Sequence, residues 1–293
     1  MTVDDRIRTW VGNGLDELVS LPRKAVLELP LVGAGVREAR QIEVTENSIA
    51  LRGLPPAFDG VRAAFLTDLH AGPLTPPAFL EKVVHATNRL KPDLVLLGGD
   101  YINRGTEYVR PLAQVLGRLK APLGLYGVLG NHDHVDNPAA VRAGLKQAGV
   151  IEVTNAGRWV SVDGSRIRIA GVGDLWWDRQ DLDAALEGAT EDDAVILLSH
   201  NPDYAVEYAV EWAMKMKDRR VGLILSGHTH GGQIRLPRVG ALHTNSRYGQ
   251  RLVSGRVSFG SFELYVSRGI GTALVPIRYH CPPEIALFTL RRG

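Results

Sequence analysis

The chain has 293 residues, and its 45% hydrophobic and 23% charged content is that of an ordinary soluble protein with a sizeable core. A net charge of +2 and a pI near 8.7 argue against nucleic acid as the main partner. Cys281 is the single cysteine, which excludes an intramolecular disulfide and fits a reducing compartment. The acidic start and the lack of a long apolar run predict neither a signal peptide nor a membrane span, so we expect a cytoplasmic protein.

The first part of the chain differs in character from the rest. Residues 4–20 place apolar side chains on one face of a helix, although two glycines weaken that helix. This face consists of Ile7, Trp10, Val11, Leu15, Leu18 and Val19. We therefore predict an amphipathic segment at 1–45 and one larger domain at 46–293. The segment either docks on that domain or lies on the inner face of a membrane.

Apolar runs alternate with helix-like stretches along the rest of the chain. Strands are expected at 61–66, 94–97, 125–129, 194–198 and 221–225, and helices at 77–90, 106–119, 138–148, 181–188 and 203–217. The runs are continuously apolar, as in strands covered on both faces. Later stretches at 166–173, 262–269 and 284–292 have more strand than helix character. The pattern predicts an α/β fold with two stacked mixed β-sheets flanked by helices.

Polar side chains follow the expected strands at their carboxyl ends. They are Asp68 and His70, Asp100, Asn131 and His132, His200, and finally His228 and His230. One such residue alone would indicate a helix cap, a turn or a structural histidine. Together they include five of the nine histidines and follow five strands. Because ligands gather at the carboxyl ends of strands in α/β sheets, the joint pattern indicates one site.

The residue types at these positions define the chemistry of the site. Imidazole and carboxylate ligands without thiolate suit Mn, Fe, Zn or similar first-row ions rather than an iron–sulfur cluster or a calcium cage. One ion needs about four protein ligands. Seven candidates besides His132 are enough for two divalent ions if one carboxylate bridges them.

The motifs D-x-H, G-D, G-N-H-D, a strand-end His and G-H-x-H, in this order, resemble the calcineurin-like metallophosphoesterase superfamily. The later stretches "GGQIRLP", "SRYGQRLVSG" and "SRGIGTALVPIRYHCPPEIALFTL" are similar to a bacterial branch of that superfamily. This branch contains the YkuE and YaeI phosphoesterases and the LpxG type of UDP-2,3-diacylglucosamine pyrophosphatase. The resemblance implies a four-layer α-β-β-α sandwich as the catalytic domain.

The resemblance also implies a role for each motif residue. Asp68, His70 and His230 would hold one ion, Asn131, His200 and His228 the other, and Asp100 both. Two such ions, with Mn expected first and Fe, Zn or Co as alternatives, would lower the pKa of a shared water, and the bridging hydroxide would attack phosphorus directly. His132 would protonate the leaving oxygen.

The stretch "GGDYINRG" is similar to the G-D-x-V-D-R-G signature of Ser/Thr protein phosphatases. In that signature the second Asp orients the catalytic histidine and the Arg clamps phosphate. Asn103 replaces the Asp here, and a neutral amide supports a protonated imidazole less well, which disfavours a protein-phosphatase mechanism. Arg104 is either a phosphate clamp or an exposed structural arginine.

The motifs leave the substrate open. The leading expectation is a phosphodiester or pyrophosphate bond, with a nucleotide-linked lipid precursor of the UDP-diacylglucosamine kind as the proposed substrate. Alternatives are cell-wall or nucleotide diesters, or a non-catalytic scaffold that binds protein partners. A turn or surface role is expected for His134, and the basic group after G-H-x-H is either a substrate groove or a solvated loop. This group comprises Arg235, Arg238, His243, Arg247 and Arg251.

Overall fold

The computed structural model describes residues 30–215 and 221–293, and the apolar face predicted within residues 4–20 lies outside them. The described part begins with helix α3 (Pro30–Glu38) and strand β1 (Glu43–Leu51). Helix α3 packs against the C-terminal part of the chain, where the Arg278 N–H donates to the Gly35 carbonyl at 3.0 Å and the Cys281 N–H to Glu38 Oε1 at 2.6 Å.

The first sheet has six strands in the order β1-β14-β2-β3-β4-β5. Its other members are β14 (Glu284–Arg292), β2 (Arg62–Leu66), β3 (Leu94–Leu97), β4 (Leu125–Gly127) and β5 (Val150–Glu152). Strand β14 runs parallel to β1 and antiparallel to β2, whereas β2 to β5 are all parallel. The carboxyl ends of β2, β3 and β4 therefore open at the same edge.

The second sheet also has six strands, in the order β12-β13-β9-β8-β7-β6. They are β12 (Gly255–Ser258), β13 (Glu263–Val266), β9 (Leu223–Ser226), β8 (Val195–Leu198), β7 (Ser165–Gly171) and β6 (Ala156–Val162). Strands β13, β9, β8 and β7 are parallel, and an antiparallel strand lies at each edge. Strands β10 (Arg235–Leu236) and β11 (Gly240–Ala241) form a separate hairpin.

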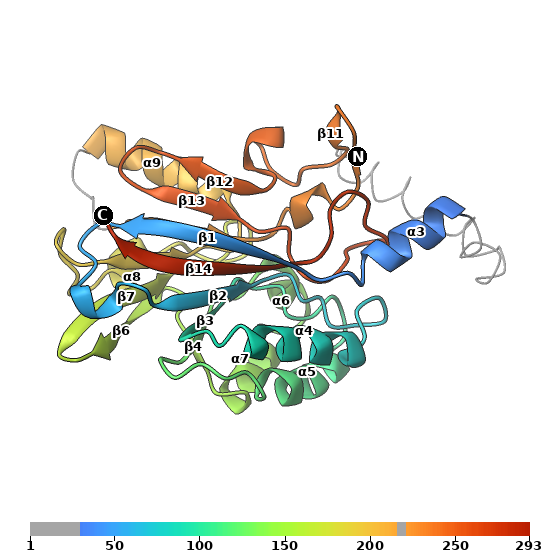
Figure 1. Cartoon of the computed structure of the whole chain (residues 1–293), viewed down its shortest axis with the longest axis horizontal. Coiled ribbons are helices and arrows are strands. Elements are labelled where there is room, and N and C mark those ends of the chain that lie inside the picture. Colours follow the sequence, from blue (N-terminus) through green and yellow to red (C-terminus); the bar gives the residue numbers. More distant parts are fainter. Residues whose placement is uncertain (1–29, 216–220) are drawn as a thin grey trace.

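Helices cover the outer face of each sheet. The first sheet carries α4 (Pro77–Arg89), α5 (Val109–Leu116) and α7 (Pro138–Gln147), which lie together below β2 in Figure 1. The second sheet packs against α8 (Leu182–Ala185) and α9 (Asp203–Lys215). Short helices lie at η1 (Pro56–Phe58), η2 (Thr106–Tyr108), α6 (Asn131–Asp136), η3 (His230–Gly232) and η4 (Gly249–Leu252). Within the described ranges, no helix is long and apolar enough to cross a membrane.

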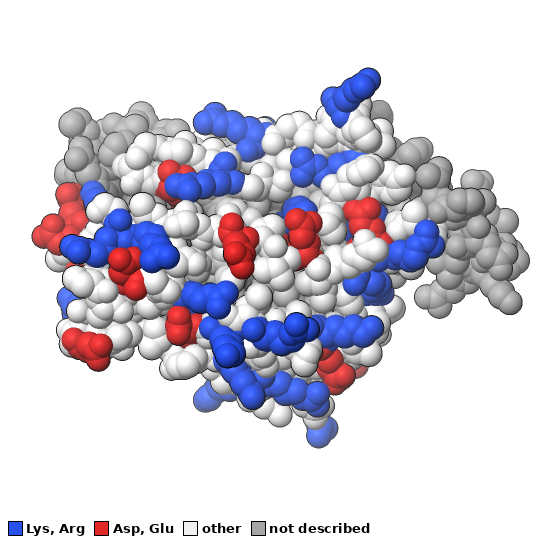
Figure 2. Space-filling model, viewed as in Figure 1, with Lys and Arg blue, Asp and Glu red and all other residues white. Residues whose placement is uncertain are grey.

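A separate cluster of buried apolar side chains fills the space between the two sheets. Phe65 and Leu96 of the first sheet pack here with Ile167, Ile196 and other buried side chains of the second. The order is thus helices, sheet, sheet, helices, and the expected four-layer fold is confirmed. On the face in Figure 2, acidic and basic side chains lie side by side across the middle and on the left, whereas basic ones predominate in the lower part.

Several element boundaries differ from the expectation. The expected helix at 106–119 is a 3-10 turn followed by α5, and the expected helix at 181–188 shrinks to α8. Helix α6 was not predicted, although the G-N-H-D motif forms its first turn. Helix α7 begins where the Asn137 side chain accepts the Ala140 N–H at 3.0 Å and Pro138 occupies the first turn, a common helix start.

Candidate metal centre

Five strand ends from the two sheets meet at one edge of the sandwich. The loops after β2, β3 and β4 of the first sheet carry Asp68 and His70, Asp100, and Asn131. The loops after β8 and β9 of the second sheet carry His200, His228 and His230. Asn131 is half-buried and the other six are buried. The structure thus brings all seven residues expected at this edge into one cluster.

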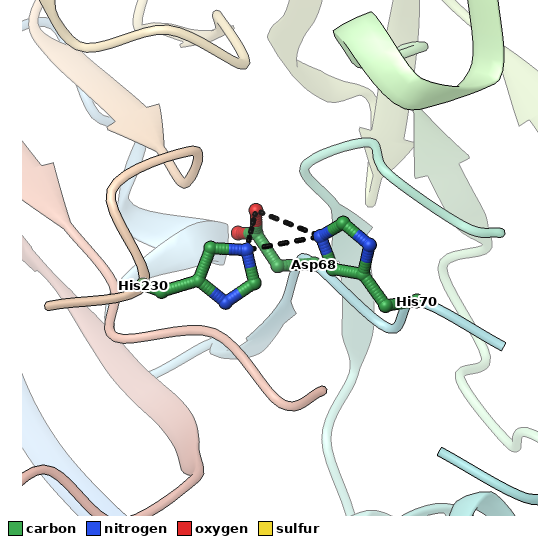
Figure 3. Close-up of side chains that lie close together, drawn as sticks. All are labelled: Asp68, His70 and His230. Carbon is green, nitrogen blue, oxygen red and sulfur yellow. Dashed lines mark hydrogen bonds and ion pairs between the residues drawn. The ribbon is translucent and has the colours of Figure 1, made fainter. Parts of the chain in front are cut away.

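Asp68, His70 and His230 form the first group of this cluster (Figure 3). The Nε2 atoms of His70 and His230 are 2.9 Å apart. Asp68 Oδ1 lies 3.4 Å from His230 Nε2 and 3.9 Å from His70 Nε2. Three atoms able to bind a cation therefore converge on one point.

Asp100 connects this first group to a second one. Its Oδ2 atom lies 3.4 Å from His70 Nε2 and also 3.4 Å from His200 Nε2. His200 Nε2 is 3.1 Å from Asn131 Oδ1, which is 2.8 Å from His228 Nδ1. One carboxylate oxygen thus lies between two sets of nitrogen and oxygen donors.

The donor atoms fit metal ions. Two ligands each about 2.1 Å from one ion are about 3.0–3.4 Å apart at ordinary coordination angles. The separations within the two groups are 2.8–3.4 Å, except for the 3.9 Å between Asp68 Oδ1 and His70 Nε2. The ring of His200 is oriented by its Nδ1 atom, 2.8 Å from the Gly98 carbonyl oxygen, which leaves Nε2 facing Asp100. Burial, reinforced by His200, lowers the pKa of His228 to about 3, so its imidazole is neutral, as ligation requires.

Strained backbone accompanies these residues. Five of the seven have positive φ angles: Asp68 (54°), His70 (46°), Asp100 (54°), His228 (69°) and His230 (53°). Such left-handed conformations cost L-residues about 1–2 kcal/mol each. Strain of this kind clusters at functional sites, where surrounding contacts hold it in place. No pattern in the sequence signalled it.

Asp133 ties two of the ligand loops together. Its buried carboxylate accepts the N–H groups of Gly130, Asp100 and Tyr101, each at 2.9 Å. Burial raises the pKa of Asp133 to about 7, nearby Asp100 acts in the same direction, and the N–H groups oppose both. Sequence reasoning missed this role, although Asp133 is the last residue of the G-N-H-D motif.

Glycines in the motifs allow the loops to approach each other. A Cβ atom at Gly130 would lie 2.6 Å from the Asp100 nitrogen and 2.7 Å from His200 Cε1. A side chain at this position would therefore push apart Asp100 and His200.

His132 is not one of the seven candidate ligands, but it forms a further group of possible donors with His70 and Asp100. Its ring stacks edge-on against His70 with the centroids 4.6 Å apart, and its backbone N–H donates to Asp100 Oδ1 at 2.8 Å. Its Nδ1 atom is 3.1 Å from the backbone carbonyl oxygen of Asn103. Asn103 thus contacts His132 through its backbone, where the sequence had suggested its side-chain amide. Arg104 is exposed on the same loop.

Arg278 supports the loop of His230 from behind, which sequence reasoning did not foresee. Its side chain is fully buried, and its guanidinium donates to the carbonyl oxygen of Gly271 at 2.6 Å and that of Cys281 at 3.1 Å. The His230 carbonyl lies 3.5 Å from the same group. The Cys281 thiol is also buried and donates to the His230 carbonyl at 3.3 Å. The stretch "PIRYHCPPE" was the available signal.

A sixth strand end reaches the same edge and was also missed. The loop after β7 carries Trp176, whose ring lies edge-on to His228 with the centroids 4.5 Å apart. His134 of α6 faces this loop, because its Nε2 atom is 4.0 Å from Asp178 Oδ2. The His134 side chain is 10% exposed, so it lies largely buried beside this loop.

The basic residues after G-H-x-H do not share one set of contacts. Arg235 donates to Ser254 Oγ at 2.9 Å, whereas Arg247 pairs with Glu207 at 3.3 Å. Arg238 and Arg251 are exposed, as is His243. The structure therefore spreads this group over several loops.

Comparisons with known proteins agree with the geometry. The profile of the calcineurin-like phosphoesterase family matches residues 61–232. The metallophosphoesterase YkuE of Bacillus subtilis is 37% identical over 258 residues, covering 87% of each chain. Phosphodiesterase YaeI of Escherichia coli is 30% identical over 230 residues, covering 77% of this chain and 80% of YaeI. The resemblance to these two proteins is thereby confirmed.

Among solved structures, the chain is similar to the NAD nucleotidase of Haemophilus influenzae. The identity is 17%, the TM-score is 0.48, and the match covers 72% of this chain and 45% of that one. The match of the family profile to more than half of the chain decides the assignment. The chain belongs to the calcineurin-like phosphoesterase family and is a metal-dependent phosphoesterase.

Proposed function

We propose that the chain is a dinuclear phosphoesterase that hydrolyses a phosphodiester or pyrophosphate bond. One ion would be held by Asp68, His70 and His230, the other by Asn131, His200 and His228, and Asp100 would contact both. The observation that carries this proposal is the position of Asp100 Oδ2, 3.4 Å from both His70 Nε2 and His200 Nε2. Manganese is the expected ion, with iron, zinc and cobalt as alternatives.

The chain's own residues supply positioning and proton transfer. Bound divalent ions provide Lewis acidity and lower the pKa of water at the site. His132 is proposed to protonate the leaving oxygen, with the Asn103 carbonyl orienting its ring through Nδ1. Arg104, exposed after Asn103, is the proposed phosphate contact. Water at the site would attack phosphorus directly, so no covalent phosphoenzyme is needed.

An apolar pocket supports a lipid-bearing substrate. It has a volume of about 160 Å³ and is lined by His230, Ile234, Leu242, Leu274 and neighbouring residues. Leu242 and Leu274 are also strongly exposed at its rim. An acyl chain entering the pocket would lie next to a candidate ligand of the first ion. We therefore propose a nucleotide-linked lipid such as UDP-2,3-diacylglucosamine as the substrate.

The exposed β10–β11 hairpin supports peripheral association with the inner face of a membrane. Leu236 and Val239 of the β10–β11 hairpin are exposed, with Arg238 between them. Apolar side chains flanked by basic ones suit an anionic lipid surface. A lipid-linked substrate would then reach the metal centre without leaving the membrane.

Three substrates tested side by side decide between these possibilities. Metal-reconstituted protein is assayed with UDP-2,3-diacylglucosamine, bis(p-nitrophenyl) phosphate and p-nitrophenyl phosphate. We expect the first two to be hydrolysed much faster than the monoester. Preference for the monoester would contradict specificity for diester or pyrophosphate bonds. Equal turnover of UDP-2,3-diacylglucosamine and bis(p-nitrophenyl) phosphate would contradict the proposed lipid-linked substrate. No turnover of any of them would favour a binding scaffold.

Metal content tests the dinuclear arrangement directly. Protein saturated with Mn²⁺ and freed of excess ion should contain two ions per chain by elemental analysis. The variant His85→Ala, altered at an exposed position of α4, serves as the control and should also contain two. A content that never exceeds one ion per chain would rule out the shared role of Asp100.

A further inference from the structure

The loop after β7, residues 172–181, is held in place by its own hydrogen bonds. Asp174 Oδ1 accepts the N–H groups of Trp176 and Trp177 at 2.9 and 3.1 Å. Asn155 Oδ1 accepts the N–H groups of Gly173 and Asp181 at 2.9 and 2.8 Å. The backbone that presents the two indoles is therefore fixed from both ends of the loop.

Two large aromatic side chains remain exposed on this fixed backbone. Trp176 is 50% exposed and Trp177 is 54% exposed. Trp176 touches the ring of His228, so the exposed part of its indole borders the metal centre. Burying an indole is strongly favourable, and an aromatic group left open beside a reaction centre is typical of ligand recognition.

The neighbours of Trp176 define what it can bind. The residues that follow it in the loop after Trp177 are polar, "DRQD" at 178–181, which disfavours an acyl chain. A flat ring with polar edges fits this setting, because it offers a π-face to the indole and hydrogen-bonding groups to the polar residues of the loop.

The geometry points to Trp176 as a stacking platform for the nucleobase of a nucleotide ester whose phosphate lies at the metal centre. This assignment rests on the proposed function and identifies the binding site for the nucleotide part of the proposed substrate. Trp176 borders His228 on the side of the second ion, whereas the apolar pocket borders His230 on the side of the first. A nucleotide-linked lipid would thus extend in two directions from the phosphate.

A pair of diesters with the same leaving group tests the platform. Thymidine 5′-p-nitrophenyl phosphate and ethyl p-nitrophenyl phosphate differ only in the group that carries the base. Stacking of a base on an aromatic side chain contributes about 1–3 kcal/mol. In Trp176→Ala, the ratio of KM for the thymidine ester to KM for the ethyl ester should rise about tenfold, and Trp176→Phe should restore most of the loss.

Trp177→Ala is the matched control, because it removes an equally exposed indole from the same loop. It should leave the KM ratio within about twofold of the parent value. An unchanged ratio in Trp176→Ala, or an equal change in Trp177→Ala, would overturn the assignment. Loss of metal from Trp176→Ala with equal losses on both esters would also overturn it, since the indole would then only support His228.

A binding measurement separates this assignment from the proposed function. Calorimetry of the metal-loaded protein compares uridine 5′-monophosphate with ribose 5-phosphate, which lacks only the base. The parent should bind the nucleotide about tenfold more tightly, and Trp176→Ala should bind both alike. Equal affinities in the parent would reject the platform even if the esters are hydrolysed. Failure to hydrolyse either ester, with selective nucleotide binding retained, would instead reject the proposed function.

Discussion

At the scale of single residues, His132 is held by one backbone carbonyl and one side-chain carboxylate of its neighbours. The ring contact comes from the Asn103 carbonyl oxygen, and the His132 N–H reaches Asp100. The His132 side chain is not one of the seven proposed ligands, although it forms a third group of possible donors with His70 and Asp100. Metal content measured together with turnover therefore separates a role in proton transfer from a role in metal binding.

We expect His132→Ala to retain metal and to lose turnover by about 10²–10⁴-fold for esters with poor leaving groups. Activated nitrophenyl esters should lose less, because their departing oxygen needs the proton less. Asn103→Ala is the control and should change kcat by less than about threefold, since it keeps the carbonyl that contacts His132. Equal losses for both kinds of ester in His132→Ala would show that it is not the general acid.

Arg278 offers a second test at this scale. The substitution Arg278→Gln leaves several buried carbonyl oxygens with fewer donors and should lower the free energy of unfolding by about 3 kcal/mol or more. It should also weaken binding of one ion, because the same guanidinium lies behind the His230 loop. Urea unfolding and Mn²⁺ titration measure the two effects. A destabilised variant with unchanged affinity for both ions would limit Arg278 to a structural role.

At the scale of elements, a polar network joins the edges of the two sheets. Glu284 at the start of β14 accepts hydrogen bonds from Thr45 of β1 and Tyr265 of β13, both at 2.7 Å. It also lies 3.5 Å from the Arg268 guanidinium. Burial would raise the pKa of Glu284, but Arg268 and the hydrogen bonds outweigh it and leave that pKa below its usual value.

Because folding lowers the pKa of Glu284, the stability that this residue contributes depends on pH. A carboxyl group whose pKa is depressed by folding stabilises the protein above its ordinary pKa of about 4.3, and this contribution is lost as pH falls through the folded value. Glu284→Gln should therefore be less stable than the parent by about 3 kcal/mol at pH 7, and the difference should shrink below about pH 4. Urea unfolding between pH 7 and pH 3 checks this. A constant difference would show that Glu284 is not ionised in the folded protein.

The elements also show what sequence patterns can predict. The runs at 61–66, 94–97 and 221–225 identified buried strands, because continuous apolar sequence in short segments requires cover on both faces. Strand β1 has alternating burial and several polar residues, "EVTENSIAL", so its pairing with β14 depends on contacts far away in the chain. Helix α6 has only six residues, and its sequence "NHDHVD" contains a single apolar side chain. Tertiary contacts of Asp133 define it instead.

At the scale of the whole molecule, the candidate ligands come from loops of both sheets. Bound ions would therefore connect the two halves of the sandwich and stabilise the folded chain. At a concentration one hundred times Kd, one site contributes about 2.7 kcal/mol. For a chain of this size that is a rise in Tm of about 5–10 °C.

Differential scanning calorimetry with Mn²⁺ and with a chelator should show this rise. Asp100→Asn should lose most of it, because Asp100 lies between the two donor groups, whereas His85→Ala should keep it. The same Tm with and without Mn²⁺ in the parent would contradict a link between the sheets through metal.

The candidate site was more predictable from sequence than the support around it. Strand ends that share a direction meet at one edge, so Asp, Asn and His placed there converge whatever the lengths of the loops between them. Arg278 and Trp176 lie far from any metal motif in the chain, and only folding brings them to His230 and His228. Their roles depend on tertiary position, and the stretch "PIRYHCPPE" around Arg278 does not by itself show that it reaches His230.

The left-handed backbone at five candidate ligands lowers the thermal stability of the metal-free protein. Glycine adopts these φ angles without penalty, so His70→Gly should unfold at a higher temperature than His70→Ala in the absence of metal, despite glycine's greater flexibility in the unfolded chain. A chain with several such replacements would lack the metal centre yet carry less backbone strain than its parent. The strain at these five positions is thus a cost of presenting the ligand side chains, which is the mark of residues placed for chemistry rather than for architecture.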